Sequence, residues 1–226
     1  MPPAGFVVDG DLILDLSVSE TSSRSAAPSK CATCEMLQHT PLACQDCHQV
    51  LAHVHGADYF ELFGLPRSYQ IDRGLLAQRY LGISRNIHPD RFAQAGPEMQ
   101  TFALRMSAAI NKAHDVLRDD FLRAEYLLES AGGVSAAEDK RVPGGLLSEV
   151  MMIREELDDA GSDREAMDRL AGQVRQRRDQ VQASIETLCE NLDRADSDAK
   201  GELRQQLNAM KYLNNLVDQF SERKAP

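Results

Sequence analysis

The sequence predicts an all-α protein, because both its apolar composition and the spacing of its apolar residues favour helices. Aromatic residues make up 5% of the 226 residues and Trp is absent, so Leu, Ile, Val, Met and Ala must form the core. Long segments carry these residues at intervals of three and four, the period of one helix face. Gly and Pro separate the segments at short intervals. We therefore expect a helical hairpin followed by a C-terminal three-helix bundle.

The charge of the chain excludes several classes of partner. The formal net charge is −10, which argues against a general nucleic-acid partner or an anionic membrane partner. No apolar run approaches the roughly 20 residues that a membrane-spanning helix needs. The first 20 residues contain four acidic residues and no Lys or Arg, unlike a secretory signal or a mitochondrial presequence. We expect neither a nucleic-acid partner nor a membrane partner, and we expect a cytoplasmic location.

Residues 1–30 are expected to form a flexible N-terminal tail. They combine an apolar piece, "FVVDGDLILDLSV", with a Ser- and Ala-rich piece, "SETSSRSAAPSK". The second piece has the composition of a flexible linker. The first piece is open to two further interpretations, an edge strand or a docking segment.

Residues 31–56 contain two C-x-x-C pairs, with nine residues between them. Two such turns can direct four thiolates at one tetrahedral zinc ion, which leaves no open position for chemistry. A reducing compartment disfavours disulfides. We expect a small zinc-knuckle segment with a structural zinc ion, and a redox pair or unligated cysteines are the alternatives. The expected ligands are Cys31, Cys34, Cys44 and Cys47.

Residues 57–131 are expected to form the helical hairpin. A short helix in "ADYFELFGLP" precedes a longer one that starts after Asp72, a plausible N-cap. Proline costs roughly 3 kcal/mol inside a helix, so the sequence His88-Pro89-Asp90 should end this second helix. Another helix opens at Pro97, where proline suits the first turn. The two long helices should be antiparallel, with the His-Pro-Asp loop exposed at their tip.

Residues 132–145 are expected to be a linker, and residues 146–226 the three-helix bundle. Each bundle helix has one core-facing apolar stripe; the first contains Leu146, Val150, Ile153 and Leu157. Leu147 and Met151 lie about 100° from this stripe at 3.6 residues per turn, and Tyr212 lies beside the third stripe. Such surplus apolar residues indicate either an interaction surface or a wide core face.

Several of these segments resemble the J-domain of HscB co-chaperones of iron–sulfur cluster assembly. The resemblance is carried by "DYFELFGLP", "IHPDRF", "INKAHDVL" and "RAEYLL", and continues into "MIREELD" and "MKYLNNL". It covers roughly residues 58–220. Some members of the family also carry paired C-x-x-C motifs before the J-domain.

The resemblance implies that the J-domain stimulates ATP hydrolysis by a DnaK/HscA-type heat-shock chaperone. It assigns the chaperone contact to His88, Pro89 and Asp90, and a basic patch suited to an acidic chaperone surface could include Arg79, Arg85 and Arg91. It also implies an IscU-type iron–sulfur scaffold as second partner. The apolar residues that bind the scaffold in HscB proteins align with Leu147, Met151 and Tyr212.

The chain is therefore expected to be an adaptor and not an enzyme. The sequence shows no nucleophile–base pair and no G-x-x-x-x-G-K-[ST] phosphate loop. Two alternatives are a general J-domain co-chaperone whose bundle serves oligomerisation or other clients, and a redox or iron–sulfur protein that uses the four clustered cysteines.

Overall fold

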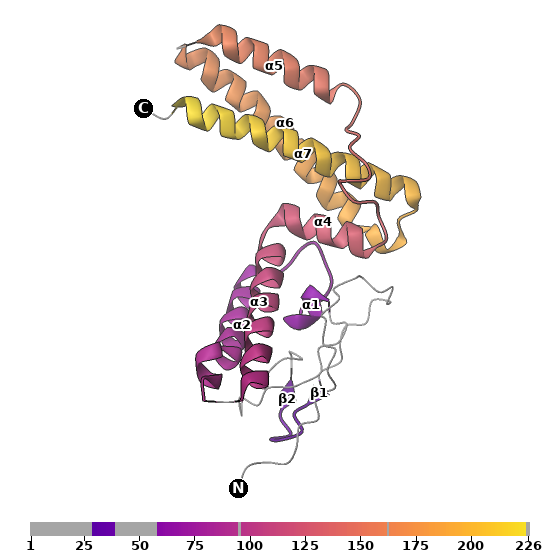
Figure 1. Ribbon diagram of the computed structural model, residues 1–226. Helices are drawn as coiled ribbons and strands as arrows, with labels where there is room; N and C mark the ends of the chain where they lie inside the picture. Colours follow the sequence, from indigo (N-terminus) through magenta and orange to yellow (C-terminus); the bar gives the residue numbers. More distant parts are fainter. Residues whose placement is uncertain (1–28, 39–57, 95, 162, 225–226) are drawn as a thin grey trace.

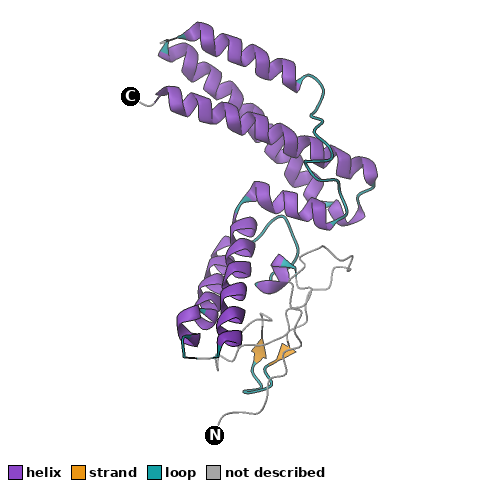
Figure 2. Cartoon of the chain, viewed as in Figure 1, coloured by secondary structure: helices purple, strands orange, loops and turns teal. Residues whose placement is uncertain are grey.

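The structure is a computed structural model that describes residues 29–38, 58–94, 96–161 and 163–224 (Figure 1). The predicted all-α class is confirmed, since helices form most of this part of the chain and loops connect them (Figure 2). The described residues also contain a hairpin of two-residue strands, β1 (Ser29–Lys30) and β2 (Leu37–Gln38), which pair antiparallel. The tail expected at residues 1–30 lies almost wholly outside the described residues, as do Cys44 and Cys47.

The first helical domain contains α1 (Tyr59–Leu62), α2 (Arg73–Ile87), a 3-10 helix η1 (Pro89–Phe92), α3 (Pro97–Arg118) and α4 (Asp120–Ser130). The predicted N-cap at Asp72 is confirmed, because its carboxylate accepts a hydrogen bond from the backbone N–H of Leu75 at 2.9 Å. Asp58 caps α1, and the carboxylate of Glu61 accepts a hydrogen bond from the backbone N–H of Asp58 in a capping box.

Helices α2 and α3 form the predicted antiparallel hairpin (Figure 1). The hydroxyl of Tyr80 donates to Oδ1 of Asn111 at 3.0 Å, and the rings of Tyr80 and His114 stack at 4.0 Å. The core between α1, α2 and α3 is apolar, and each large side chain buried in it contributes about 1.5–3 kcal/mol. Its fully buried members include Phe60, Phe63, Leu76, Ile83, Ile87, Ile110 and Leu117.

The second helical domain is the predicted three-helix bundle of α5 (Leu146–Ala160), α6 (Arg164–Glu190) and α7 (Ser197–Lys224), with a 3-10 turn η2 (Leu192–Arg194) before α7. The stripe of α5 predicted from the sequence is buried at all four positions. Gly145 precedes α5 at φ 82° and Gly161 follows it at φ 52°, values that favour glycine. The segment between α4 and α5 corresponds to the predicted linker.

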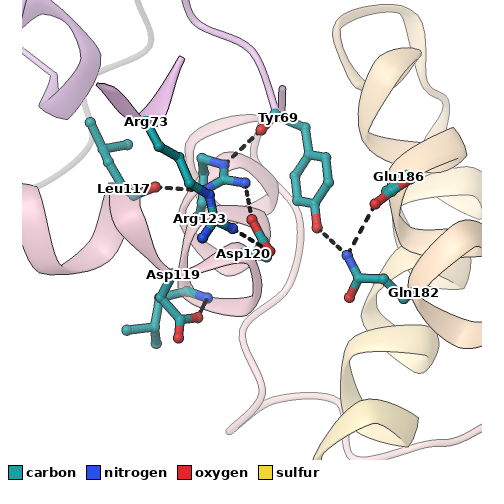
Figure 3. Close-up of polar contacts among 9 residues, drawn as sticks. Tyr69, Arg73, Leu117, Asp119, Asp120, Arg123, Gln182 and Glu186 are labelled. Carbon is teal, nitrogen blue, oxygen red and sulfur yellow. Dashed lines mark hydrogen bonds and ion pairs between the residues drawn. The ribbon is translucent and has the colours of Figure 1, made fainter. Parts of the chain in front are cut away.

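Helix α4 lies across α6 and α7 and joins the two domains (Figures 1 and 2). Arg123 of α4 is buried and donates hydrogen bonds to three residues, as shown in Figure 3. Its Nε donates to the carbonyl of Tyr69 at 2.7 Å, its Nη1 to the carbonyl of Leu117 at 2.5 Å, and its Nη2 to the carboxylate of Asp120. The hydroxyl of Tyr69 in turn accepts from Nε2 of Gln182 on α6. The guanidinium of Arg123 therefore fixes the loop that contacts the bundle.

A second polar contact joins α4 to α7. Arg204 of α7 is fully buried, and both of its terminal nitrogens donate to the carboxylate of Glu125. Lys211 also lies 3.1 Å from that carboxylate. The paired charges make this buried contact tolerable, because an unpaired charge at the same place would be costly.

Candidate functional site

The His-Pro-Asp motif lies at the tip of the hairpin, and its polar side chains face solvent. His88 ends α2 with φ −59° and ψ 130°, the extended conformation that a following proline favours. Pro89 then begins η1, where its missing N–H has no helical partner to lose. The side chains of His88 and Asp90 are 57% and 89% exposed. The predicted exposed tip is therefore present.

Local hydrogen bonds hold the tip in one geometry. The backbone N–H of Asp90 donates to Nδ1 of His88 at 3.3 Å. The hydroxyl of Ser107 on α3 donates to the carbonyl of Ile87 at 3.3 Å, and the Gln100 amide donates to the carbonyl of Ala93 at 2.9 Å. Because α3 contacts the chain on both sides of the motif, the loop is fixed to the hairpin.

The three arginines predicted beside the tip differ in their surroundings. Arg85 at the end of α2 and Arg91 in η1 are exposed. Arg79 is half-buried, and its Nη1 donates to the carbonyls of Phe63 and Gly64 after α1. The guanidinium of Arg79 thus connects the end of α1 to α2. The sequence analysis missed this contact because no local sequence pattern indicates it.

The surplus apolar residues of the bundle are exposed, as expected for an interaction surface. The exposed fraction is 48% for Leu147, 62% for Met151 and 37% for Tyr212. Met152, which the sequence analysis did not single out, is also exposed. It lies about 100° further round α5 than Met151, at the rim of a groove between α5 and α6 with a volume of about 380 Å³. Its place off the core stripe was the signal that could have identified it.

The first C-x-x-C pair forms the turn of the β1–β2 hairpin. The N–H of Cys31 donates to the carbonyl of Met36 at 2.9 Å, and the N–H of Glu35 donates to the carbonyl of Cys31 at 2.8 Å. The N–H of Thr33 points at the sulfur of Cys31, 3.4 Å away. An N–H donor beside the sulfur favours a thiolate, so this turn fits one half of a tetrathiolate site. Among the described residues no group of three or more metal-ligating side chains occurs; the second predicted pair lies outside them.

Buried titratable groups lie away from these surfaces. Burial raises the pKa of Cys189 to about 12, which keeps it a thiol inside the bundle. Burial, followed by the charge of Arg118, lowers the pKa of His114 within the hairpin core. No helix of the described residues is both long enough and apolar enough to cross a membrane.

Comparison with known proteins extends across both helical domains. Residues 142–221, about a third of the chain, match the family model of the HSCB C-terminal oligomerisation domain. The crystal structure of human co-chaperone protein HscB is 25% identical, with a TM-score of 0.68 over 88% of this chain and 100% of that chain. The chain is HscB-like.

Two further structures support this assignment. Chaperone HscB from Vibrio cholerae is 29% identical, with a TM-score of 0.62 over 74% of this HscB-like chain and 98% of that chain. The Jac1 co-chaperone from Saccharomyces cerevisiae is 25% identical, with a TM-score of 0.51 over 77% and 97% of the two chains. Each alignment is longer than the C-terminal domain, so the hairpin contributes to the likeness.

Proposed function

We propose that this chain is a J-type co-chaperone of iron–sulfur cluster assembly that activates the ATPase of a DnaK/HscA-type chaperone and delivers an IscU-type scaffold to it. The observation that carries the proposal is the exposed His88-Pro89-Asp90 tip on a rigid hairpin, in a chain whose fold matches co-chaperones along most of its length. ATP is hydrolysed by the partner, and the chain itself has no catalytic role.

The geometry of the tip suits recognition by charged and polar groups. The carboxylate of Asp90 can accept a bidentate hydrogen bond from an arginine of the chaperone, the strongest geometry for such a pair. Nδ1 of His88 accepts from the Asp90 backbone, so a neutral imidazole carries its proton on Nε2 and offers a donor there. Pro89 supplies the fixed φ that keeps both groups in place. Arg85 and Arg91 add positive charge beside them.

The bundle supplies the second binding surface. Leu147 and Met151 are one turn apart on α5, and Tyr212 projects from α7. Exposed apolar side chains of this size bind a partner through burial of their surface. The hydrogen bonds from Gln182 to Tyr69 and from Arg204 to Glu125 join the two domains, so the two partners are held in a defined mutual orientation.

We also propose a structural zinc ion on Cys31, Cys34, Cys44 and Cys47. Four thiolates satisfy tetrahedral zinc, which then cross-links the segment and performs no reaction. The turn around Cys31 supports the proposal, since it contains both cysteines of the first pair and places an N–H donor at the sulfur of Cys31. A cytoplasmic location belongs to the same proposal.

Steady-state ATPase turnover of the cognate chaperone tests the first half of the proposal. His88→Gln should keep the helical content and stability of the chain, because the side chain is exposed, and should abolish stimulation. Gln94→Ala, an exposed change just after η1, is the matched control and should leave stimulation unchanged. Normal stimulation by a folded His88→Gln variant refutes the mechanism.

Scaffold binding tests the second half and separates the proposal from a general J-domain co-chaperone. Replacement of Leu147, Met151 and Tyr212 by alanine should abolish binding of the scaffold and leave ATPase stimulation by the co-chaperone alone intact. Leu122→Ala removes an exposed leucine from α4 and serves as the control. If the triple variant loses both activities or neither, the assignment of the bundle surface is wrong.

A further inference from the structure

One apolar and basic surface surrounds the tip, and we call it the outer hairpin face. It consists of Leu81 and Arg85 on α2, Leu104 on α3 and Arg91 in η1, all of which are exposed. Leu81 and Arg85 are four residues apart and so are neighbours on one side of α2.

The register of the hairpin brings Leu104 to the same region. Tyr80 bonds to Asn111, and the carbonyl of Ile87 accepts from Ser107. In an antiparallel pair with this register, Leu104 lies level with the His-Pro-Asp loop. Leu81 lies about 10 Å further from the tip, at 1.5 Å per residue. Two exposed leucines thus flank the side of the hairpin that carries Arg85.

This face is locally basic although the chain is acidic. Helix α2 contains three arginines and no acidic residue, whereas the whole chain has a net charge of −10. Arg73 pairs with Asp120 at 2.6 Å, and Arg79 bonds to backbone carbonyls. Arg85 makes no ion pair within the described ranges, and together with Arg91 it leaves the face suited to an acidic and apolar partner.

The chain itself contains a segment of that chemistry. Residues 6–18, "FVVDGDLILDLSV", hold eight large apolar residues, three aspartates and no Lys or Arg. They lie outside the described structure, which begins at Ser29. The ten residues between this segment and Ser29 can span at most about 33 Å. That distance exceeds the length of α2, which is about 22 Å for 15 residues.

We propose that residues 6–18 dock on the outer hairpin face, with their leucines against Leu81 and Leu104 and their aspartates beside Arg85 and Arg91. Tethering supports this occupant, because a short linker raises the effective concentration of the segment to about the millimolar range. Docking does not depend on the proposed function. The consequence of docking rests on the proposed function: the docked segment covers the surface beside the tip and competes with the chaperone for that surface.

Photo-crosslinking of the full chain tests the docking without any chaperone. Leu14 is replaced by benzoylphenylalanine, unlabelled and 15N-labelled chains are mixed, and the irradiated sample is digested for mass spectrometry. We expect crosslinks within one chain to peptides that contain Leu81 or Leu104. The yield should fall several-fold in the Arg85→Glu/Arg91→Glu variant and at 1 M salt, because screening weakens exposed charge pairs.

Other crosslinking results overturn the proposal. Mixed-isotope crosslinks identify a second copy of the chain as the occupant, and crosslinks to α5, α6 or α7 identify another surface. Absence of crosslinks to the hairpin also rejects it. The same probe at Ser22, in the linker-like piece, is the matched control and should label the hairpin much less.

ATPase titration then tests the consequence. A full chain with Leu12→Ser, Leu14→Ser and Leu16→Ser should reach half-maximal stimulation of the chaperone at a several-fold lower concentration than the wild type. An unchanged or higher concentration rejects competition. Failure of His88→Gln to abolish stimulation refutes the proposed function and leaves the crosslinking result standing, so the two failures are distinguishable.

Discussion

The hydroxyl of Tyr69 lies 2.5 Å from Nε2 of Gln182, so a loop residue of the first domain is joined to the middle of α6 in the second (Figure 3). Burial raises the pKa of Tyr69 to about 12, which keeps the hydroxyl neutral. The carbonyl of the same residue accepts from Arg123. Tyr69 is therefore fixed at its backbone and at its side chain.

Removal of the hydrogen bond between Tyr69 and Gln182 should weaken the contact between the domains. We expect Tyr69→Phe and Gln182→Leu each to lower the free energy of unfolding by about 1 kcal/mol, the usual net value of one hydrogen bond. The double variant should lose less than the sum, because both changes remove the same interaction. Urea denaturation of the four proteins measures the coupling, with Gln176→Leu on the exposed side of α6 as control. Strictly additive losses would contradict a direct interaction.

Arg123 should be the most sensitive polar residue of α4. Arg123→Met leaves the carbonyls of Tyr69 and Leu117 without this buried donor and removes one of the two arginines that bond to Asp120. We expect a loss of about 3 kcal/mol or more in the free energy of unfolding. Arg123→Lys should recover only part of it, since an ammonium cannot reproduce the planar fork of a guanidinium. Arg118→Lys, on an exposed side chain, should change stability by less than about 0.5 kcal/mol. Thermal or urea unfolding decides between these values.

The pair of Glu125 and Arg204 predicts a dependence of stability on pH. Burial raises the pKa of Glu125, but hydrogen bonds from Arg204 and Lys211 outweigh it, so the pKa is lower than its usual value of 4.5. The folded state thus binds fewer protons than the unfolded state near that pH. The stabilisation that this carboxylate gives to the folded state is fully present above the pKa of Glu125 in the unfolded chain. It is lost as the pH falls through the lower pKa of Glu125 in the folded state.

Urea midpoints between pH 3 and pH 7 test this dependence. Glu125→Gln should be less stable at pH 7, because Arg204 stays buried without its carboxylate, and its midpoint should fall less steeply toward acid. Glu129→Gln changes an exposed carboxylate of the same helix and should retain the wild-type slope. Parallel curves for wild type and Glu125→Gln would show that this carboxylate does not carry the effect.

Metal analysis tests the proposed zinc site. Purified chain should contain one colourless zinc ion, and Cys31→Ser or Cys47→Ser should remove most of it, because each change deletes one of four ligands. Cys189→Ala should retain the metal, since that thiol is buried in the bundle and protonated. Visible absorbance from bound iron would instead favour an iron–sulfur protein, and retention of zinc by Cys47→Ser would reject this ligand set.

Sequence patterns identified the elements whose signals are local. The cap at Asp72, the proline that ends α2 and the core stripe of α5 are each determined by residues within a few positions of one another. The exposed tip follows from the same cause, because proline restricts its own φ and the residue before it. The positions of Leu147 and Met151 beside the core stripe follow from the helical period, whereas the structure was needed to show that both side chains are exposed.

Contacts between residues far apart in the sequence could not be predicted from local patterns. The sequence analysis placed Arg79 beside the tip, but the structure shows it bonded to the carbonyls of Phe63 and Gly64. It gave no role to Arg123 or Arg204, which resemble ordinary surface arginines in their local sequence. Their burial depends on how α4 crosses α6 and α7.

The sequence by itself determined the order of the helices, the residues that face each core and the polar tip, since periodicity, capping and proline act over one or two turns. The tertiary structure alone decided the joint between the two domains, including the bond from Tyr69 to Gln182 across 113 positions of the chain. The reason is physical: a hydrogen bond between distant residues needs particular packing angles and distances, which no short stretch of sequence encodes.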